Sequence, residues 1–365
     1  MISMKQCELL VVGAGPAGLG AAIEAARLGV SVLLIDENDT AGGQLFKQIH
    51  KFFGSKEHYA GTRGFQIGQA LLREASALGV EVMLNARAVG LLDDGSVAVQ
   101  YGKDLIQIQA SKLILATGAK ENAITFPGWT LPGVMTAGAA QTFSNVYDTL
   151  VGKNILMVGS GNVGLIVSYQ LMQAGAHIKG LVEVLPAISG YGVHAGKIKR
   201  AGVPIWTKHT VLEAKGKRRV EEVVIGEVDD QRKPVYGTQK TLEVDTILLA
   251  VGLTPRVELA SMAGCRLGVE RILGGHLPVH NQEMLSTKDS VYVCGDLAGV
   301  EEANTALDEG RLAGTAAAEA LGYSDAKTAD KKRCLVEGLH DLRMGTFGEK
   351  RLDCKSRVIE KWSCV

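Results

Sequence analysis

Two apolar runs, each leading into a glycine-rich turn, are the most regular feature of the chain. Residues 9–12 and 155–158 are apolar at every position, which is typical of strands buried on both faces of a parallel sheet. Each run is followed by a hexapeptide with glycine at its first, third and sixth positions, and then by a segment with helical periodicity. The pattern predicts two strand–turn–helix units and favours two dinucleotide-binding sites in one chain.

The first hexapeptide has the residues that a pyrophosphate requires at the start of a helix. Gly13 permits a tight turn out of the strand, Gly15 lets the backbone approach a pyrophosphate, and Gly18 lets the helix pack close to the strand. Pro16 fits the first helical turn, and Ala17 follows it. The free N–H groups of that turn attract an anion. The alternative, an ordinary glycine-rich turn, leaves the order of the surrounding motifs unexplained.

Several further motifs complete the first unit. A second apolar strand ends at Asp36 and Glu37, about 20 residues past the glycines, where an acid accepts ribose hydroxyls. Residues 41–44 form a Gly-Gly turn, residues 114–118 a buried strand with a small-residue end, and residues 291–296 a late strand ending in Gly-Asp.

With these motifs the chain resembles the two-dinucleotide-binding-domain flavoproteins over residues 7 to 325. The resemblance implies FAD as a cofactor, with the late Gly-Asp motif on the flavin ribityl chain and pyrophosphate. A helix is expected over residues 301–321, and the N–H groups of its first residues, 301–306, which include Ala303, are expected to face the flavin ring. The expected FAD contacts are Gly13, Gly15, Pro16, Ala17, Gly18, Asp36, Glu37, Gly43, Gln44, Lys47, Ala116, Thr117, Gly118, Gly295, Asp296 and Ala303.

The second hexapeptide predicts a second nucleotide site. Its expected contacts are Gly159, Gly161, Asn162, Val163 and Glu183, the last at the end of the following strand. No arginine follows Glu183 closely to accept a 2′-phosphate, so NADH is favoured over NADPH. Another adenine nucleotide, or no ligand, is the alternative.

The order of the motifs predicts an α/β fold with two Rossmann-like dinucleotide-binding domains, each with a β-meander. The second domain is inserted in the first. Residues 1–118 and 281–325 are expected to form the FAD-binding domain, residues 119–280 an NAD(H)-like domain, and residues 326–365 a polar C-terminal tail.

Composition narrows the class of protein. Lysine plus arginine and aspartate plus glutamate each number 39, so no basic face for nucleic acid is implied. No apolar run approaches the roughly 20 residues of a membrane span, and a strand begins near the N-terminus, so we expect a cytoplasmic protein without a signal peptide.

The six cysteines form no CxxC pair, which argues against a disulfide reductase. No metal site is expected, although three cysteines, Cys334, Cys354 and Cys364, leave a tail cluster as the alternative to free thiols.

Residues 126–134, 136–141, 190–194 and 202–205 carry a closer resemblance. They look like the alpha subunits of opine oxidase, dye-linked proline and hydroxyproline dehydrogenases, hydrogen cyanide synthase and heteromeric sarcosine oxidase. The resemblance implies oxidation of a small-molecule amine or imino acid, directly or through a flavin-containing partner subunit. It also implies an iron–sulfur electron carrier as a partner. Relatives often carry a cysteine-rich extension whose motifs this tail lacks.

No residue stands out as a general base. His50, His58 and His194 are each more simply structural, and Gln44 and Lys47 are better candidates for polar groups facing the flavin. The sequence thus predicts an FAD-dependent oxidoreductase that moves hydride or electrons between NADH, FAD and a partner. A self-contained NADH-dependent flavin reductase and a non-catalytic nucleotide-binding scaffold are the alternatives.

Overall fold

The computed structural model describes residues 3–345 and 348–364. The chain forms two compact units: Met1–Lys120 together with Thr254–Val365, and Glu121–Leu253. The chain crosses between them at β7 (Ala119–Glu121) and β16 (Leu253–Pro255), which pair with each other. The predicted α/β class, with one Rossmann-like unit inserted in another, is confirmed.

The first unit is built on a sheet whose parallel strands lie in the order β3-β2-β1-β6, with β19 beside β6. The long strand β6 pairs with a β-meander through its first half and with β19 through its second half. Every residue of β2 is buried, as expected for a strand covered on both faces. The strands are β1 (Ser3–Val12), β2 (Val32–Ile35), β3 (Glu81–Met83), β4 (Ala86–Leu91), β5 (Val97–Tyr101), β6 (Asp104–Leu115) and β19 (Val291–Val293).

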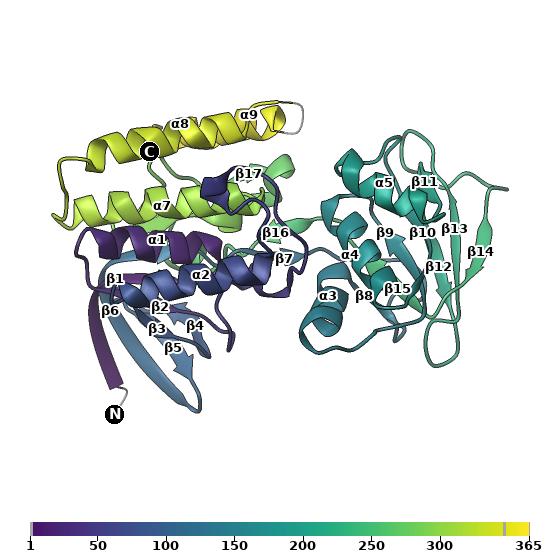
Figure 1. The fold of residues 1–365 in the computed structure, drawn as a ribbon, viewed down its shortest axis with the longest axis horizontal. Coiled ribbons are helices and arrows are strands. Elements are labelled where there is room, and N and C mark those ends of the chain that lie inside the picture. Colours follow the sequence, from purple (N-terminus) through teal and green to yellow (C-terminus); the bar gives the residue numbers. More distant parts are fainter. Residues whose placement is uncertain (1–2, 346–347, 365) are drawn as a thin grey trace. The chain divides into compact units, whose positions relative to one another are not determined.

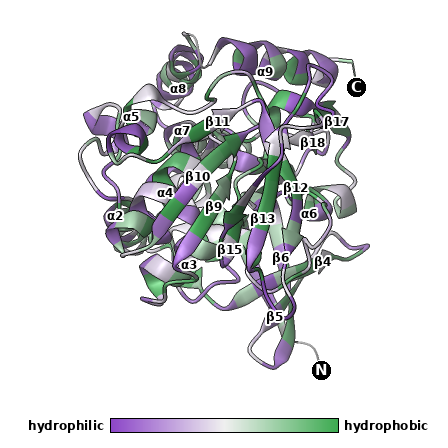
Figure 2. Ribbon diagram, turned by 90° about the vertical axis from the view of Figure 1, so that its right-hand side faces the viewer, coloured by the Kyte–Doolittle hydropathy of each residue, from purple (hydrophilic) through white to green (hydrophobic). Residues whose placement is uncertain are grey.

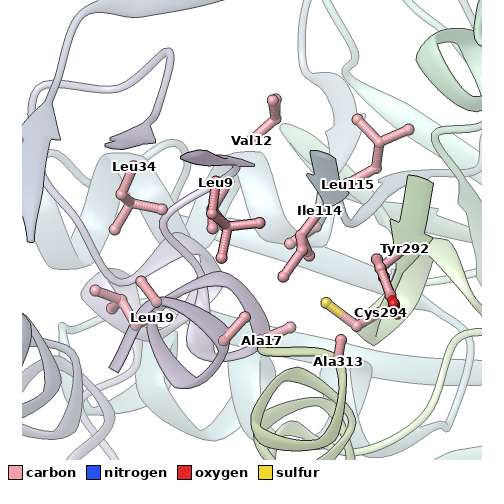
Figure 3. Close-up of a cluster of buried hydrophobic side chains, with 14 of the residues drawn as sticks. Leu9, Val12, Ala17, Leu19, Leu34, Ile114, Leu115, Tyr292, Cys294 and Ala313 are labelled. Carbon is pink, nitrogen blue, oxygen red and sulfur yellow. The ribbon is translucent and has the colours of Figure 1, made fainter. Parts of the chain in front are cut away.

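Helices α1 (Pro16–Arg27) and α7 (Ala303–Ala320) pack side by side against this sheet (Figure 1). Small residues allow their backbones to come close: a Cβ on Gly310 would lie 1.9 Å from the carbonyl oxygen of Ala17, and one on Gly314 2.1 Å from that of Ala21. Helix α2 (Gly64–Ala77) packs on α1. Figure 3 shows the apolar core between sheet and helices, with Leu9, Leu34, Ile114, Ala17, Leu19 and Ala313 among its members.

The C-terminal segment forms helices where a polar tail was expected. Helix α8 (Thr328–Leu342) packs on α7, and α9 (Glu349–Trp362) follows it. Both helices are rich in hydrophilic residues (Figure 2). However, Cys354 and Val358, one turn apart on α9, are buried against Leu273 and Leu277. This narrow apolar stripe, too short to stand out in the sequence, holds α9 on the first unit.

The first unit also resumes earlier than expected, at Thr254 in place of residue 281. Helix α6 (Glu258–Met262) and strands β17 (Leu267–Glu270) and β18 (Gly275–Pro278) belong to it. The reason is burial, because Ala260 and Cys265 lie in the core of the first unit.

The second unit repeats the pattern of the first. Its parallel sheet has the order β11-β10-β9-β15-β8, and the separate meander has the order β12-β13-β14. Two apolar clusters contain residues of this sheet, and Figure 2 shows the hydrophobic positions along β9 and β15. The elements are β8 (Val134–Thr136), α3 (Ala137–Val146), β9 (Asn154–Val158), α4 (Asn162–Gln173), β10 (His177–Glu183), α5 (Gly192–Arg200), β11 (Ile205–Thr207), β12 (His209–Lys215), β13 (Glu222–Glu227), β14 (Lys240–Glu243) and β15 (Thr246–Leu249).

The close crossing of α1 and α7 predicts a sharp contrast between two helical glycines. Gly314→Ala should lower the free energy of unfolding by about 2 kcal/mol or more, because its methyl group overlaps the α1 backbone. Gly338→Ala, on α8, meets no atom within 4 Å and should be neutral or stabilise by about 0.5–1 kcal/mol. Urea unfolding of both variants measures the difference, and equal effects would contradict the close crossing.

Candidate dinucleotide-binding sites

The first glycine hexapeptide, residues 13–18, is called the first fingerprint below, and residues 159–164 the second. The first fingerprint folds as a turn in which close contacts with the protein's own backbone require two of the three glycines. Gly13 has a φ of +108°, which few other residues adopt, and a Cβ there would lie 2.3 Å from the carbonyl oxygen of Ala116. A Cβ on Gly18 would lie 1.7 Å from the carbonyl oxygen of Gly13. Both positions therefore fix how α1 leaves the sheet.

Gly15 differs from these two because the protein leaves space beside it. A Cβ there would meet nothing closer than Gly43 Cα at 3.8 Å, and its backbone angles are extended. Gly15 caps α1, Pro16 occupies the first helical position, and the first turn carries no acidic residue. The space at Gly15 and the free N–H groups of α1 fit a pyrophosphate.

The second fingerprint repeats this construction. A Cβ on Gly159 would lie 2.2 Å from the carbonyl oxygen of Ala250, and one on Gly164 2.3 Å from that of Gly159. A Cβ on Gly161, at the start of α4, would meet nothing closer than Ser189 Oγ at 3.8 Å. The two turns thus share the same required glycines and the same open position.

Asp36, expected as a ribose acceptor, holds the fingerprint turn. Its buried carboxylate accepts the N–H of Ala14 at 2.6 Å, and the main-chain and side-chain N–H groups of Asn38 at 2.9 and 2.7 Å. Glu37, beside it, is more exposed and forms ion pairs with Arg256 and Arg87. These two arginines outweigh partial burial and hold the pKa of Glu37 below its usual value.

Glu183 has the same structural task in the second unit. Its buried carboxylate accepts the N–H and hydroxyl of Ser160 at 3.0 and 2.6 Å, the N–H of Leu185 at 2.9 Å and the hydroxyl of Ser189 at 3.2 Å. Three of these four donors bond to Oε2, and one, the Leu185 N–H, bonds to Oε1. Because each carboxylate oxygen has two lone pairs, Oε1 can still accept a ribose hydroxyl.

A second glycine loop lies against each fingerprint, and only one of the two was expected. A Cβ on Gly43 would lie 2.7 Å from Gly15 Cα, and one on Gly190 2.9 Å from the nitrogen of Asn162. Gly43 follows Asp36 at the same spacing at which Gly190 follows Glu183. This equal spacing is the sequence signal that would have identified Gly190.

The late Gly-Asp turn lies against α1 and α7. A Cβ on Gly295 would lie 2.7 Å from that of Ala17, and the Gly295 N–H donates to Glu309 Oε2 at 3.0 Å. The half-buried Asp296 accepts a long hydrogen bond of 3.4 Å from the Glu301 N–H. Burial, together with the nearby acids Glu309, Glu301 and Glu302, raises the pKa of Asp296 to about 7. This carboxylate is suited to accept hydroxyl donors such as those of a ribityl chain.

The other expected contacts lie around these turns. The hydroxyl of Thr117 donates to the carbonyl oxygen of Arg256 at 3.0 Å, and the main-chain N–H of Arg256 donates to the carbonyl oxygen of Gly118 at 2.9 Å. Gln44 is exposed and Lys47 half-buried, both in the 3₁₀ helix that starts at Gly43. Ala303 begins α7, and in the second unit Asn162 and the exposed Val163 begin α4.

The histidines have structural contacts. His58 Nε2 lies 2.7 Å from Asp308 Oδ2 on α7, and its Nδ1 lies 2.8 Å from Ser55 Oγ. His50 stacks on Phe52. His194 is buried on α5, and burial together with Lys197 lowers its pKa. None of these contacts indicates a proton-transfer role.

The cysteines and acids show no metal cluster in the part of the chain that the structure describes. All six cysteines are unpaired, and Cys354 is buried on α9 while Cys334 and Cys364 are exposed. No helix among the described residues is both long and apolar enough to cross a membrane.

Together the two units define a class of protein, an α/β oxidoreductase fold with two dinucleotide-binding turns. Each turn, residues 13–18 in the first unit and 159–164 in the second, together with the helix that follows it, is called a cradle. Residues 7–310 match the family model described as pyridine nucleotide-disulphide oxidoreductase. The chain belongs to this family, whose members bind FAD and NAD(P)H. The family's name includes a disulphide, but this chain has no two closely spaced cysteines that could form one.

Known relatives agree with the expected resemblance. The chain is 28% identical over 340 residues to an opine oxidase component of Agrobacterium tumefaciens, covering 88% of this chain and 67% of the relative. It is 30% identical over 325 residues to the HcnB component of hydrogen cyanide synthase from Pseudomonas aeruginosa (83% and 69%). It is also 30% identical over 331 residues to the alpha component of sarcosine oxidase from a Corynebacterium (87% and 33%). The chain therefore spans between a third and about two thirds of these proteins.

Solved structures confirm the fold. L-proline dehydrogenase from P. horikoshii superposes with a TM-score of 0.70 at 24% identity, over 92% of this chain and 60% of that one. Thioredoxin reductase from T. acidophilum gives 0.70 at 21% identity, over 87% and 99%.

The open position at Gly15 predicts a loss of ligand without a loss of fold. Gly15→Val should abolish flavin retention, because its side chain occupies the space expected for the pyrophosphate, whereas Gly161→Val should spare flavin. Near-native melting temperatures of both apoproteins provide the control. Flavin absorbance after gel filtration is the measurement, and equal loss from both folded variants would contradict the assignment of the sites.

The raised pKa of Asp296 predicts that ionisation of this side chain lowers the free energy of unfolding of the apoprotein. The folded state keeps a proton that the unfolded state releases between about pH 4 and pH 7, so this contribution to stability falls as pH rises through that window. Asp296→Asn should therefore raise the melting temperature of the apoprotein more at pH 8 than at pH 5, while weakening flavin binding. Calorimetry at both values tests this, and a pH-independent difference would argue against it.

Proposed function

We propose that the chain binds FAD in its first unit and NADH in its second. In this role it is the dinucleotide-binding subunit of a complex that oxidises an amine or imino acid. NADH oxidation, or oxidation of the amine on a partner, would supply electrons to FAD, and an iron–sulfur carrier is the proposed further acceptor. The observation that carries the proposal is the presence of two glycine turns of one construction, each with open space beside the glycine that caps the helix.

In the first unit, the residues present fit FAD. Gly15 and the N-terminus of α1 would hold the pyrophosphate, and Asp296 would accept ribityl hydroxyls. Asp36 keeps the turn in place through Ala14, which leaves Glu37 as the acid with the more accessible carboxylate for the adenosine ribose. Bound FAD supplies a two-electron acceptor, so the protein chiefly binds and orients.

In the second unit, charge supports NADH over NADPH. The buried Glu183 carboxylate lies behind the fingerprint turn, bonded to Ser160, and a 2′-phosphate near it would meet a like charge. Three protein donors already bond to Oε2 of Glu183, which leaves Oε1 to accept a ribose hydroxyl, so we attribute the expected preference mainly to repulsion of the phosphate.

The partner is inferred from the relatives. Those described above are named as subunits of an opine oxidase, a hydrogen cyanide synthase and a sarcosine oxidase. A small-molecule amine or imino acid oxidised on a flavin-containing partner subunit is consistent with all three names. A self-contained NADH-dependent flavin reductase and a scaffold without turnover are the competing functions.

Anaerobic reduction of the purified protein separates these functions. We expect FAD, released by heat and identified by chromatography, and bleaching of its absorbance by NADH at least about tenfold more efficiently than by NADPH, a factor that corresponds to about 1.4 kcal/mol. Candidate amino acids should bleach the flavin only when the partner subunit is present.

Other outcomes support the alternatives. Bleaching by NADH followed by turnover without any partner would favour the self-contained reductase. FAD that neither nucleotide bleaches would favour the scaffold or a different adenine nucleotide in the second unit. Predominant FMN, or failure to take up any flavin on reconstitution, would contradict the proposal.

A further inference from the structure

A buried cluster of four charged residues connects the C-terminal helices to the late Gly-Asp turn. Glu301 precedes α7, Glu309 lies on it, Arg343 follows α8, and Lys355 lies on α9. All four side chains are at most 10% exposed, and Lys355 and Glu309 are each only 2% exposed. The signs balance, with two acids and two bases, so the cluster avoids an uncompensated buried charge.

Lys355 has contacts that reach beyond its own helix. Its ammonium donates to Glu309 Oε1 at 2.6 Å and to the carbonyl oxygen of Ala298 at 2.9 Å. The other oxygen of Glu309 accepts the N–H of Gly295 at 3.0 Å. Lys355 therefore contacts Ala298 directly and is connected to Gly295 through Glu309, so it reaches both ends of the segment 295–298.

Arg343 completes the cluster from α8. Its guanidinium donates to both oxygens of Glu301, at 2.7 to 3.1 Å, and to Glu309 Oε1 at 2.5 Å. The N–H of Glu301 in turn donates to Asp296. The acids nearest to Asp296 are thus held in place by cations from the C-terminal helices.

Docking of α9 does not by itself require this cluster. Cys354 and Val358 already pack on Leu273 and Leu277, and Glu270 pairs with Arg357 and Lys361 at another point on the helix. A fully buried lysine carries a high desolvation cost, whereas an apolar residue of similar size would secure the helix without it. The cluster is therefore best explained by what it holds, which is the segment 295–298.

We propose that Lys355 is a positioning residue for the flavin: through Glu309 and Ala298 it fixes the Gly295–Asp296 turn that contacts the cofactor. This inference rests on the proposed FAD site in the first unit. It gives the C-terminal helices a role in cofactor binding, although none of their residues belongs to the motifs of either cradle.

The test compares two lysines of α9. Lys355→Met removes the ammonium that reaches the turn, while Lys361→Met removes an ion pair with Glu270 that lies elsewhere on the helix. Hydrogen exchange of the apoprotein is read in a peptide covering residues 294–300, and FAD affinity is measured by fluorescence titration. For Lys355→Met we expect exchange at least about tenfold faster in this peptide and a Kd for FAD at least about tenfold higher, a change expected from losing a hydrogen bond to a charged group. Lys361→Met should leave both within about twofold of the wild type.

A second variant covers the case in which Lys355→Met does not fold. Lys355→Met with Glu309→Gln removes one charge of each sign and leaves Arg343 paired with Glu301, so it should fold. It should still bind FAD more weakly than the wild type, because the bond to Ala298 is lost. Unchanged exchange in residues 294–300 and unchanged FAD affinity in the Lys355 variants would overturn the positioning role. Failure of the wild type itself to bind FAD would instead contradict the proposed function.

Discussion

The close backbone contacts around the start of α1 are the constraint on which the first unit depends. Gly13 lies against the end of β6 and Gly18 lies against Gly13, while Gly310 brings α7 onto α1. No side chain larger than hydrogen fits at these positions, so α1, the sheet and α7 have one arrangement. That arrangement places the N-terminus of α1, the 3₁₀ turn at Gly43 and the Gly295–Asp296 turn next to one another.

The same physical solution is used twice, with a different distribution of polar groups. In both units a buried acid at the end of the second strand accepts the N–H of the residue between the first two glycines. In the first unit a further acid, Glu37, remains partly exposed and is paired with arginines. In the second unit two serine hydroxyls donate to one oxygen of Glu183, Oε2. The turns are thus alike in construction, while the surfaces offered to a ribose differ.

The sequence predicted the elements that depend on local chemistry and missed those that depend on distant packing. Apolar runs and glycine spacing located both strand–turn–helix units, because backbone conformation and close approach leave a direct trace in residue type. The bonds of Asp36 to Ala14 and Asn38 could not be predicted this way, since a carboxylate at a strand end can bind a ribose or the protein's own backbone, and its role as a ribose acceptor stays a prediction. The helical C-terminal segment was missed for another reason. Its apolar stripe is narrow, and Lys355 and Arg343 are buried only because Glu301 and Glu309, some 34 to 54 residues earlier in the chain, neutralise them. A charged residue whose partner is so far away reads as a surface residue in the sequence.

The central claim is that two similar cradles hold two different nucleotides in one chain. Native mass spectrometry of the purified protein, before and after addition of NADH, tests it most directly. We expect one FAD per chain at the outset and one further NADH after addition. A chain that carries no FAD after reconstitution, or that takes up two copies of the same nucleotide, would contradict it.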